Sequence, residues 1–224
     1  MIVGNNQLLI GYRLIRGLLM GLVFLTVAGS ACRQAPNLLL FGSMNTSRTT
    51  DNPASGRWAE QMQVQGLPNL YRVSADLYRG AQPKAEGLKE LKKLGIRTVV
   101  DLRESSGNQA RLAELGLVYK RIPMTAFFVK DDDVVRFLQI VGNPGHTPIF
   151  VHCQRGADRT GLMCAVYRIA IQGWTKDEAI AEMTQGGFRF NHGYQNVVNY
   201  LQDLDAGQIK RRAGLAPELS TSLN

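Results

Sequence analysis

The sequence has few cysteines, no internal repeats and no basic stripe interleaved with aromatic side chains. With only three cysteines in 224 residues, it cannot form the disulfide framework that holds small secreted domains together. The basic residues are scattered, so we expect no nucleic-acid partner. What remains is a chain long enough for one domain of about 150 residues with additional segments.

Acidic residues are also absent from the first 31 positions, where Arg13 and Arg16 are the only charged side chains. An apolar run from residue 17 to residue 28 follows, which is short for a membrane span of about 20 residues. Small residues come next at 29–31. This layout is typical of a secretory signal peptide, with an uncleaved anchor as the alternative. We therefore predict an exported protein, either periplasmic or membrane-anchored and facing the periplasm.

Cys32 directly follows these small residues. Ser30-Ala31-Cys32 resembles the end of bacterial lipoprotein signals, which are cleaved before a cysteine that then carries lipid. Gly29 departs from that pattern, because such signals usually carry a larger aliphatic residue there. Lipidation would tether the protein to a membrane through its N-terminus, whereas ordinary cleavage near Ala31 would leave a free thiol. Removing residues 1–31 lowers the formal charge from +8 to +6, which still attracts anionic substrates.

The rest of the chain divides by composition into three parts. Residues 32–66 are rich in polar residues without periodicity and indicate a linker. Residues 67–206 show regular patterns and indicate the catalytic domain. Residues 207–224 indicate a C-terminal tail.

Short β-branched runs alternate with amphipathic segments through residues 67–206. We predict strands at 70–73, 77–78, 97–102, 118–122 and 147–151, and helices at 85–94, 108–115, 134–141, 161–170, 175–183 and 196–204. Such alternation implies an α/β fold with a central, mostly parallel sheet covered by helices on both faces.

The most informative motif is His152-Cys153, followed by five residues and then by Arg159-Thr160-Gly161. Cys153 comes at the end of a predicted strand, and a predicted helix begins after the loop. The backbone N–H groups of such a loop can surround an anion, and the helix N-terminus adds its positive end. The planar guanidinium of Arg159 suits two phosphate oxygens. The same field stabilises a thiolate, so Cys153 is predicted to attack phosphorus.

These residues resemble the signature loop of the cysteine-dependent protein tyrosine and dual-specificity phosphatases. The resemblance covers residues 67 to 205 and includes Tyr78-Arg79-Gly80-Ala81-Gln82-Pro83 and the run from Leu94 to Arg103. It implies the fold of that family and hydrolysis of phosphomonoesters through a phosphocysteine intermediate, with no metal and no cofactor. The Cys-x5-Arg spacing alone also occurs in sulfurtransferases. His152 before the cysteine and Thr160-Gly161 after the arginine favour the phosphatases.

The resemblance also implies roles for residues of the loop. Arg159 is expected to bind the phosphoryl oxygens, His152 to orient the loop, and Thr160 to donate its hydroxyl to the sulfur. The expected substrate-binding residues are Gln154, Arg155, Gly156, Ala157, Asp158 and Arg159.

The general acid is where the sequence departs from its relatives. The family's usual position corresponds to residues 124–127, which contain no acid. Asp131 is our first candidate, although Asp131-Asp132-Asp133 also suits the first turn of a helix. Asp158 is the rival, because myotubularin-type lipid phosphatases carry the same Asp-Arg-Thr sequence. A purely structural role within the loop is the alternative for Asp158.

Two substrate classes and one non-enzymatic function remain open. Phosphotyrosine proteins are the leading substrates, and Phe127 and Phe128 could form the wall of a pocket for an aromatic ring. Arg155 adds a cation at the pocket rim, which suits a phosphoinositide or an inositol polyphosphate. The missing acid leaves open a phosphate-binding pseudophosphatase.

Overall fold

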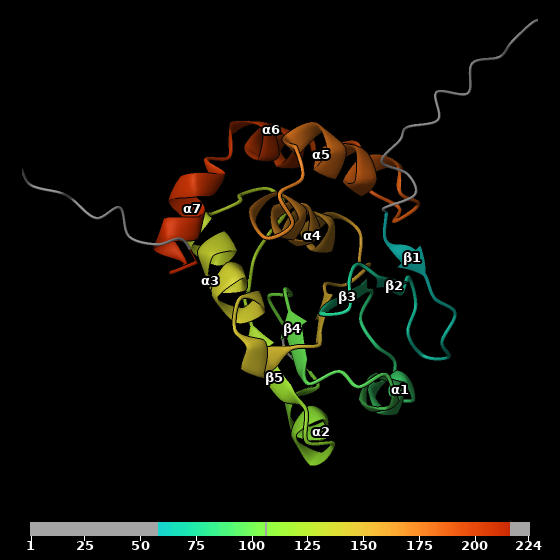
Figure 1. Ribbon diagram of the computed structural model, residues 1–224. Coiled ribbons are helices and arrows are strands. Elements are labelled where there is room, and N and C mark those ends of the chain that lie inside the picture. The colour runs from blue at the N-terminus through green and yellow to red at the C-terminus, as the bar shows by residue number, and fades with distance from the viewer. Residues whose placement is uncertain (1–57, 106, 216–224) are drawn as a thin grey trace, which may run out of the picture. The chain divides into compact units, whose positions relative to one another are not determined.

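A computed structural model describes residues 58–105 and 107–215, which form a six-stranded sheet with helices on both faces (Figure 1). The strands are β1 (Glu60–Gln61), β2 (Tyr71–Arg72), β3 (Leu77–Gly80), β4 (Thr98–Asp101), β5 (Val118–Arg121) and β6 (Ile149–His152). The helices are α1 (Gly87–Lys93), α2 (Gln109–Glu114), α3 (Asp131–Val141), α4 (Asp158–Ala170), α5 (Lys176–Gln185), α6 (Gln195–Asp203) and α7 (Ala206–Arg212), with a 3-10 turn, η2 (Pro144–His146).

The strand order is β1-β2-β3-β6-β4-β5. Strands β3, β6, β4 and β5 are parallel, whereas β1 and β2 add an antiparallel edge. The mostly parallel sheet predicted from the sequence is therefore confirmed. In the register of the three inner strands, His152 lies beside Gly80 on one side and Asp101 on the other. The loop that begins at Cys153 therefore leaves the carboxyl edge of the sheet, where ligands bind in open α/β sheets.

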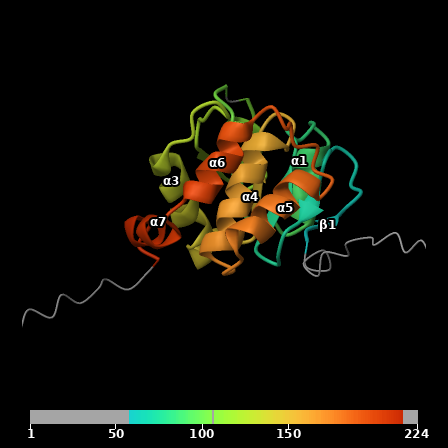
Figure 2. The ribbon, with the colours of Figure 1, turned by 90° about the horizontal axis from the view of Figure 1, so that it is seen from above.

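Alternate residues of β4 and β6 supply two separate cores. Val99 and Phe150 face the core beneath α1 and α2, whereas Val100 and Val151 face the larger core beneath α3 to α7. Both strands are buried along their whole length, which explains why Val99-Val100 and Ile149-Phe150-Val151 are apolar at successive positions and do not alternate with polar residues. Helix α4 lies within the larger core, flanked by α5 and α6 (Figure 2). Its position fixes the helix N-terminus that closes the loop after Cys153.

Helix α5 begins with a capping box, in which the Thr175 side chain accepts from the Glu178 N–H and the Glu178 carboxylate accepts from the Thr175 N–H. The sequence pattern at this position predicted that start. Helix α3 likewise begins at Asp131, with three aspartates in its first turn. Negative charge at this end is stabilised by the helix dipole.

Both predicted boundaries of the domain need correction. Residues 58–66 were predicted as linker, but β1 pairs with β2 and the Ala59 N–H donates to Glu182 Oε1 at 2.7 Å. Residues 207–224 were predicted as a tail, but α7 is capped by Asp205 and buries Ile209 in the larger core. A two-residue strand and a seven-residue helix are too short to give a clear periodic pattern. The predicted signal peptide and Cys32 lie outside the described residues.

None of the helices in residues 58–105 and 107–215 is both long and apolar enough to span a membrane. Within the same residues, no group of three or more His, Cys, Asp or Glu side chains is arranged to hold a metal ion.

Candidate active site

Cys153 lies at the base of a pocket of about 200 Å³ at the carboxyl edge of the sheet. The pocket is lined by Glu104, Thr125, Ala126, Phe127, Cys153, Gln154, Arg155, Asp158, Arg159 and Tyr194. Thus the structure places six of the predicted residues, Cys153, Gln154, Arg155, Asp158, Arg159 and Phe127, around one space. The first residue after β6 and the first turn of α4 meet here, as the strand–loop–helix pattern predicted.

The loop curls around the sulfur at Gly156, whose N–H donates to Cys153 Sγ at 3.3 Å. Gly156 has a φ of +69°, a conformation that favours glycine. A Cβ at this position would also lie 2.4 Å from the Gly80 carbonyl. Gly156 is thus required both by its backbone conformation and by the close approach of β3.

The thiol of Cys153 has a lowered pKa. Burial alone would raise it, but the hydroxyl and N–H of Thr160, the charge of Arg159 and the Gly156 N–H outweigh burial. Thr160 is fully buried. Its hydroxyl is the foremost of the groups that lower the pKa of the Cys153 thiol, which is compatible with the predicted contact between this hydroxyl and the sulfur. The result is a nucleophile that is more readily ionised than an ordinary thiol.

This arrangement predicts how fast Cys153 is alkylated as pH changes. The rate of alkylation by iodoacetamide should increase with pH and reach a plateau. The midpoint of this increase should lie below the ordinary thiol pKa of about 8.5. Thr160→Val should move that midpoint upward, because it removes the hydroxyl that favours the thiolate, whereas Thr160→Ser should not. Peptide mass spectrometry separates Cys153 from Cys164, whose pKa burial raises to about 11. A wild-type midpoint at the ordinary value would contradict the assigned thiolate environment.

Arg159 points from the first turn of α4 towards the same pocket. Its Nη1 donates to the carbonyls of Met124 at 3.1 Å and Leu102 at 3.3 Å. These two bonds hold the guanidinium in one orientation and leave the other N–H groups available for an anion. A fixed guanidinium beside a thiolate is an arrangement suited to binding phosphate oxygens.

A buried polar network that the sequence did not predict lies beneath the loop. Asp101 accepts from Arg103 Nε at 2.9 Å, from Arg103 Nη2 at 2.7 Å and from the Tyr119 hydroxyl at 2.9 Å. Burial would raise the pKa of Asp101, but these donors and nearby His152 lower it overall. Asp101 is therefore a carboxylate that fixes Arg103 close to Cys153.

His152 lies next to this network and is neutral. Burial lowers its pKa to about 4, despite the opposing influence of Asp101. Its Nδ1 lies 3.2 Å from the Cys153 carbonyl oxygen, so the ring can donate to the backbone at the start of the loop. The predicted role of His152 in orienting the loop is compatible with this contact.

Arg79 on β3 is a second feature that sequence reasoning missed. It is 1% exposed, and its Nη2 donates to the carbonyls of Gly156 at 2.9 Å and Ala157 at 3.4 Å. Its guanidinium also lies 3.8 Å from the centre of the Phe188 ring. By binding these two carbonyls, Arg79 fixes the backbone of the loop at Gly156 and Ala157. The Tyr78–Pro83 motif was available as a signal, but nothing in it indicated contact with the loop.

The structure separates the two predicted acids. Asp131 accepts from the Tyr200 hydroxyl at 2.8 Å and from Arg212 at 3.1 Å, and it lines a different pocket, with α6 and α7. Asp131 as the general acid is therefore wrong, because its carboxylate joins α3 to the C-terminal helices. Asp158 does line the Cys153 pocket, but its Oδ1 accepts from the Asn191 N–H at 2.8 Å.

Glu104 is the other carboxyl group that lines the pocket, and it was not predicted from the sequence. It is the third residue after β4, and it is exposed. The available signal was its position just after the predicted strand at 97–102, at the edge of the sheet from which the Cys153 loop also leaves.

An aromatic pair borders the pocket. Phe127 packs edge-on against Tyr194, with ring centres 5.1 Å apart. Asn196 Nδ2 donates to the carbonyls of Ala126 at 2.6 Å and Phe127 at 3.2 Å, which fixes the segment before α3 against α6. Phe127 remains 66% exposed, so its ring is available to a ligand. Phe128 is 74% exposed and does not line the pocket.

Comparisons with known proteins agree with this geometry. A family model described as "DSP-PTPase phosphatase fused to NAD+ Kinase" matches residues 61–197. The dual specificity protein phosphatase TpbA of Pseudomonas aeruginosa is 34% identical over 173 residues, which cover 77% of this chain and 78% of that protein. The inositol diphosphatase DSP5 of Arabidopsis thaliana is 24% identical over 155 residues, which cover 64% of this chain and 73% of that protein.

Solved structures show the same likeness. A crystal structure of a cysteine-to-serine variant of P. aeruginosa TpbA in complex with phosphotyrosine matches with a TM-score of 0.63 and 32% identity, covering 75% of this chain and 99% of that one. The catalytic core of Siw14 has a TM-score of 0.60 and 23% identity, covering 69% of this chain and 95% of that one.

Proposed function

The chain belongs to the dual-specificity branch of the cysteine-dependent phosphatases, and from that premise we propose that it dephosphorylates phosphotyrosine in proteins outside the cytoplasm. We infer the substrate class from the residues that form the pocket. Its base is the Cys153 thiol with a lowered pKa, and its wall is the exposed face of the Phe127–Tyr194 pair. An aromatic wall suits the ring of phosphotyrosine, because stacked rings attract beyond the area that they bury.

In the proposed reaction, the Cys153 thiolate attacks phosphorus. The S–P bond forms as the bond to the leaving oxygen breaks, and that oxygen takes a proton. Arg159 and the N–H groups of the loop bind the remaining phosphoryl oxygens, whose charge increases in the transition state. Water then cleaves the S–P bond, releasing phosphate and the thiolate. Thr160, buried behind the sulfur, favours departure of the thiolate in this second step.

We assign the protonating role to Glu104. Asp158 is buried, and its bond to the Asn191 N–H fixes the segment that follows α5. Glu104 is exposed on the rim of the pocket, so its carboxyl group is free to approach a leaving oxygen. This assignment makes Asp158 a structural residue of the loop, which was the alternative left open by the sequence.

The two carboxyl groups can be separated by the choice of leaving group. Glu104→Gln should lower kcat for an alkyl phosphate about 100-fold, because an alkoxide needs a proton. The same variant should turn over a nitrophenyl phosphate nearly as well as the wild type, since nitrophenolate leaves without help. Asp158→Asn should impair both substrates to a similar degree. Selective loss on the alkyl phosphate in Asp158→Asn would instead make Asp158 the acid.

An inositol phosphate or a phosphoinositide is the second candidate substrate. Arg155 lies exposed at the rim of the pocket, where it can bind an additional phosphate. The similarity to plant inositol diphosphatases favours the same class.

A substrate panel distinguishes these two classes. We expect kcat/KM to be higher for phosphotyrosine peptides than for soluble inositol polyphosphates and for phosphoinositides in mixed micelles. Cys153→Ser, assayed in parallel, gives the background rate for each substrate. Negligible peptide turnover beside rapid inositol phosphate turnover would reject the leading substrate class.

Export is the remaining part of the proposal. Its support is the acid-free, arginine-bearing segment 1–31, followed by Cys32. The full chain, produced in a Gram-negative host, should be recovered in the periplasmic or membrane fraction. Cys32→Ser should release it from the membrane fraction if that cysteine carries lipid. Recovery of the full-length chain with the cytoplasmic proteins would contradict export.

A further inference from the structure

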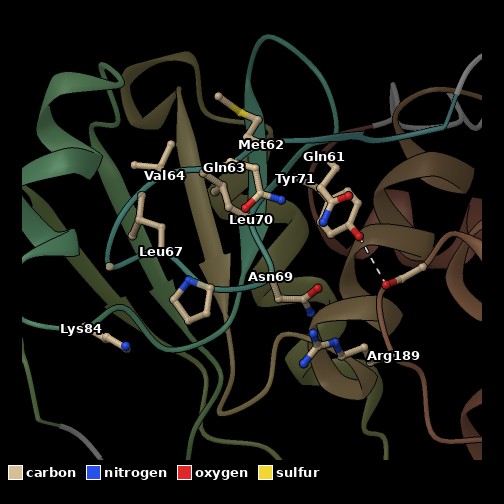
Figure 3. A pocket seen from close by; sticks show the side chains of 13 residues that line it. Gln61, Met62, Gln63, Val64, Leu67, Asn69, Leu70, Tyr71, Lys84 and Arg189 are labelled. Atoms are coloured by element: carbon tan, nitrogen blue, oxygen red, sulfur yellow. Dashed lines mark hydrogen bonds between the residues drawn. The ribbon is translucent and has the colours of Figure 1, made fainter. Parts of the chain in front are cut away.

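A second pocket, of about 310 Å³, has no role in the proposed reaction, and one of its lining residues, Asn69, contacts the phosphate-binding loop. It lies between the β1–β2 edge of the sheet and the segment after α5 (Figure 3). Lys84 and Arg189 point towards it from opposite sides, and Asn69 lies between them (Figure 3). We refer to this space as the Lys84–Arg189 pocket.

The side chains of this pocket favour an anion. Two of its thirteen lining residues are cationic and none is acidic. Lys84 and Arg189 are both exposed, and neither side chain forms an ion pair or a hydrogen bond with any described residue. Amide groups of Gln61, Gln63 and Asn69 complete the polar lining. Unpaired cations in a concave surface raise the local concentration of an anionic partner.

The backbone holds Arg189 in an unusual conformation. Arg189 has a φ of +65° and Asn69 a φ of +54°, and these two are the only non-glycine residues with positive φ in the part of the chain that the structure describes. Both line this pocket. A left-handed conformation at arginine carries a strain that asparagine tolerates better. Such strain is maintained only where surrounding contacts enforce it.

Those contacts join the Lys84–Arg189 pocket to the catalytic loop. Asn69 Nδ2 donates to the Arg155 carbonyl at 3.1 Å and to the Phe188 carbonyl at 3.2 Å. One amide therefore binds both the loop and the residue before Arg189. On the other side of Arg189, the Asn191 N–H donates to Asp158 of the loop. Arg189 thus has a fixed position relative to Cys153.

Lys84 has a comparable connection. The Gln82 N–H donates to the Gln154 carbonyl at 3.3 Å, and the Lys84 N–H donates to the Gly66 carbonyl at 2.9 Å. Lys84 is two positions after Gln82, so at most about 7 Å of chain separates it from the contact with the loop. That is also the distance over which an extended peptide advances by two residues.

We propose that the Lys84–Arg189 pocket binds an acidic side chain that lies within about three residues of the phosphotyrosine in a substrate peptide. The inference rests on the proposed function, since the phosphotyrosine must occupy the Cys153 pocket. Arg155 lines the Cys153 pocket, and its carbonyl binds Asn69 of the Lys84–Arg189 pocket. Its side chain therefore adds a positive charge near both pockets. The amide side chains of the pocket can pair with the backbone of an extended peptide, which favours a peptide over a lipid headgroup.

The test compares matched phosphotyrosine peptides that differ only in flanking glutamate or glutamine. For the wild type, kcat/KM should be about 5- to 10-fold higher for the glutamate peptide at low salt, and the preference should shrink as salt rises. The double variant Lys84→Gln/Arg189→Asn should lose that preference. Asparagine retains the left-handed backbone at position 189. Arg189→Lys, which keeps the charge, should retain most of the preference.

The control variant Lys210→Gln/Arg211→Gln removes the same charge from α7, at the opposite end of the molecule from β1 (Figure 1). It should keep the peptide preference. A preference that survives in Lys84→Gln/Arg189→Asn, or that disappears equally in the control variant, would overturn the proposal. Nitrophenyl phosphate has no flanking residue, so its turnover tests the Cys153 pocket separately. Absence of that turnover in the wild type would indicate failure of the proposed function itself.

A third arm distinguishes the source of the anion. Inositol hexakisphosphate is added as a competitor of nitrophenyl phosphate turnover. Weak inhibition that is unchanged in Lys84→Gln/Arg189→Asn supports a peptide carboxylate as the partner. Strong inhibition of the wild type that is lost in that double variant would assign the pocket to small polyphosphates and reject the peptide.

Discussion

A Cys153→Ser variant is expected to lose turnover of nitrophenyl phosphate by about 10⁴-fold or more while it still binds phosphate. The serine hydroxyl is not ionised at neutral pH, so the variant lacks the nucleophile. The Gly156 N–H and the Arg159 guanidinium, which we propose bind the anion, remain in place. Initial rates and titration calorimetry with a phosphotyrosine peptide measure the two effects separately.

Cys164→Ala is the matched control, because Cys164 is also buried but belongs to the hydrophobic face of α4. It should retain most of the wild-type rate. If Cys153→Ser kept a rate within about tenfold of the wild type, Cys153 would not be the nucleophile. A wild type that binds phosphate but shows no Cys153-dependent turnover would instead be a phosphate-binding pseudophosphatase.

The second large effect is on stability, at the buried ion pair between α4 and α5. Arg168 Nε donates to Glu182 Oε2 at 2.7 Å and Arg168 Nη2 to Glu182 Oε1 at 2.5 Å, and both side chains are 3% exposed. Glu182→Gln leaves the Arg168 charge buried without its carboxylate. We expect this to lower the free energy of unfolding by about 3–5 kcal/mol, as measured by urea denaturation.

Arg168→Met should lower the free energy of unfolding by a similar amount, because it leaves the Glu182 carboxylate buried without its partner. It also removes the contact of the guanidinium with the Trp174 ring at 4.2 Å. The double variant should cost less than the sum of the two single variants, since neither charge then remains unpaired. Glu60→Gln is the surface control: the Arg72–Glu60 pair is 51% and 65% exposed, so its loss should change stability by less than about 1 kcal/mol. If Glu182→Gln lowered the free energy of unfolding by less than about 1 kcal/mol, this would contradict the structural role of the buried pair.

The parts of the fold that the sequence predicted are those encoded by local patterns. The β-branched strand before Cys153, the apolar helix after Gly161 and the capping box at Thr175 each depend on residues close together in the chain. The chemistry of the loop is local too, because Gly156, Arg159 and Thr160, which act on the Cys153 sulfur, all lie within seven residues of it. For that reason, the loop could be described from its sequence alone.

The contacts that escaped prediction join residues far apart in the chain. Arg79 binds carbonyls 77 and 78 residues away, and the sequence gives no indication of that pairing. Asp131 stood at a plausible distance before Cys153, but helix α3 directs it to Tyr200 and Arg212. Glu104 was not predicted because the residues that surround it in the pocket are distant in the sequence and come together only on folding. In each case the tertiary arrangement decides the role.

The contact between Gly156 and Gly80 has a consequence for protein engineering. Because the two backbones meet with no room for a Cβ at Gly156, the reactive loop and strand β3 form one unit despite their separation along the chain. Grafting residues 152–161 onto another strand–helix scaffold would therefore transfer the cysteine without its support. A transplant would have to include Arg79 and Gly80 as well. The same two residues offer a filter for genome searches, since chance occurrences of Cys-x5-Arg would lack this distant partner segment.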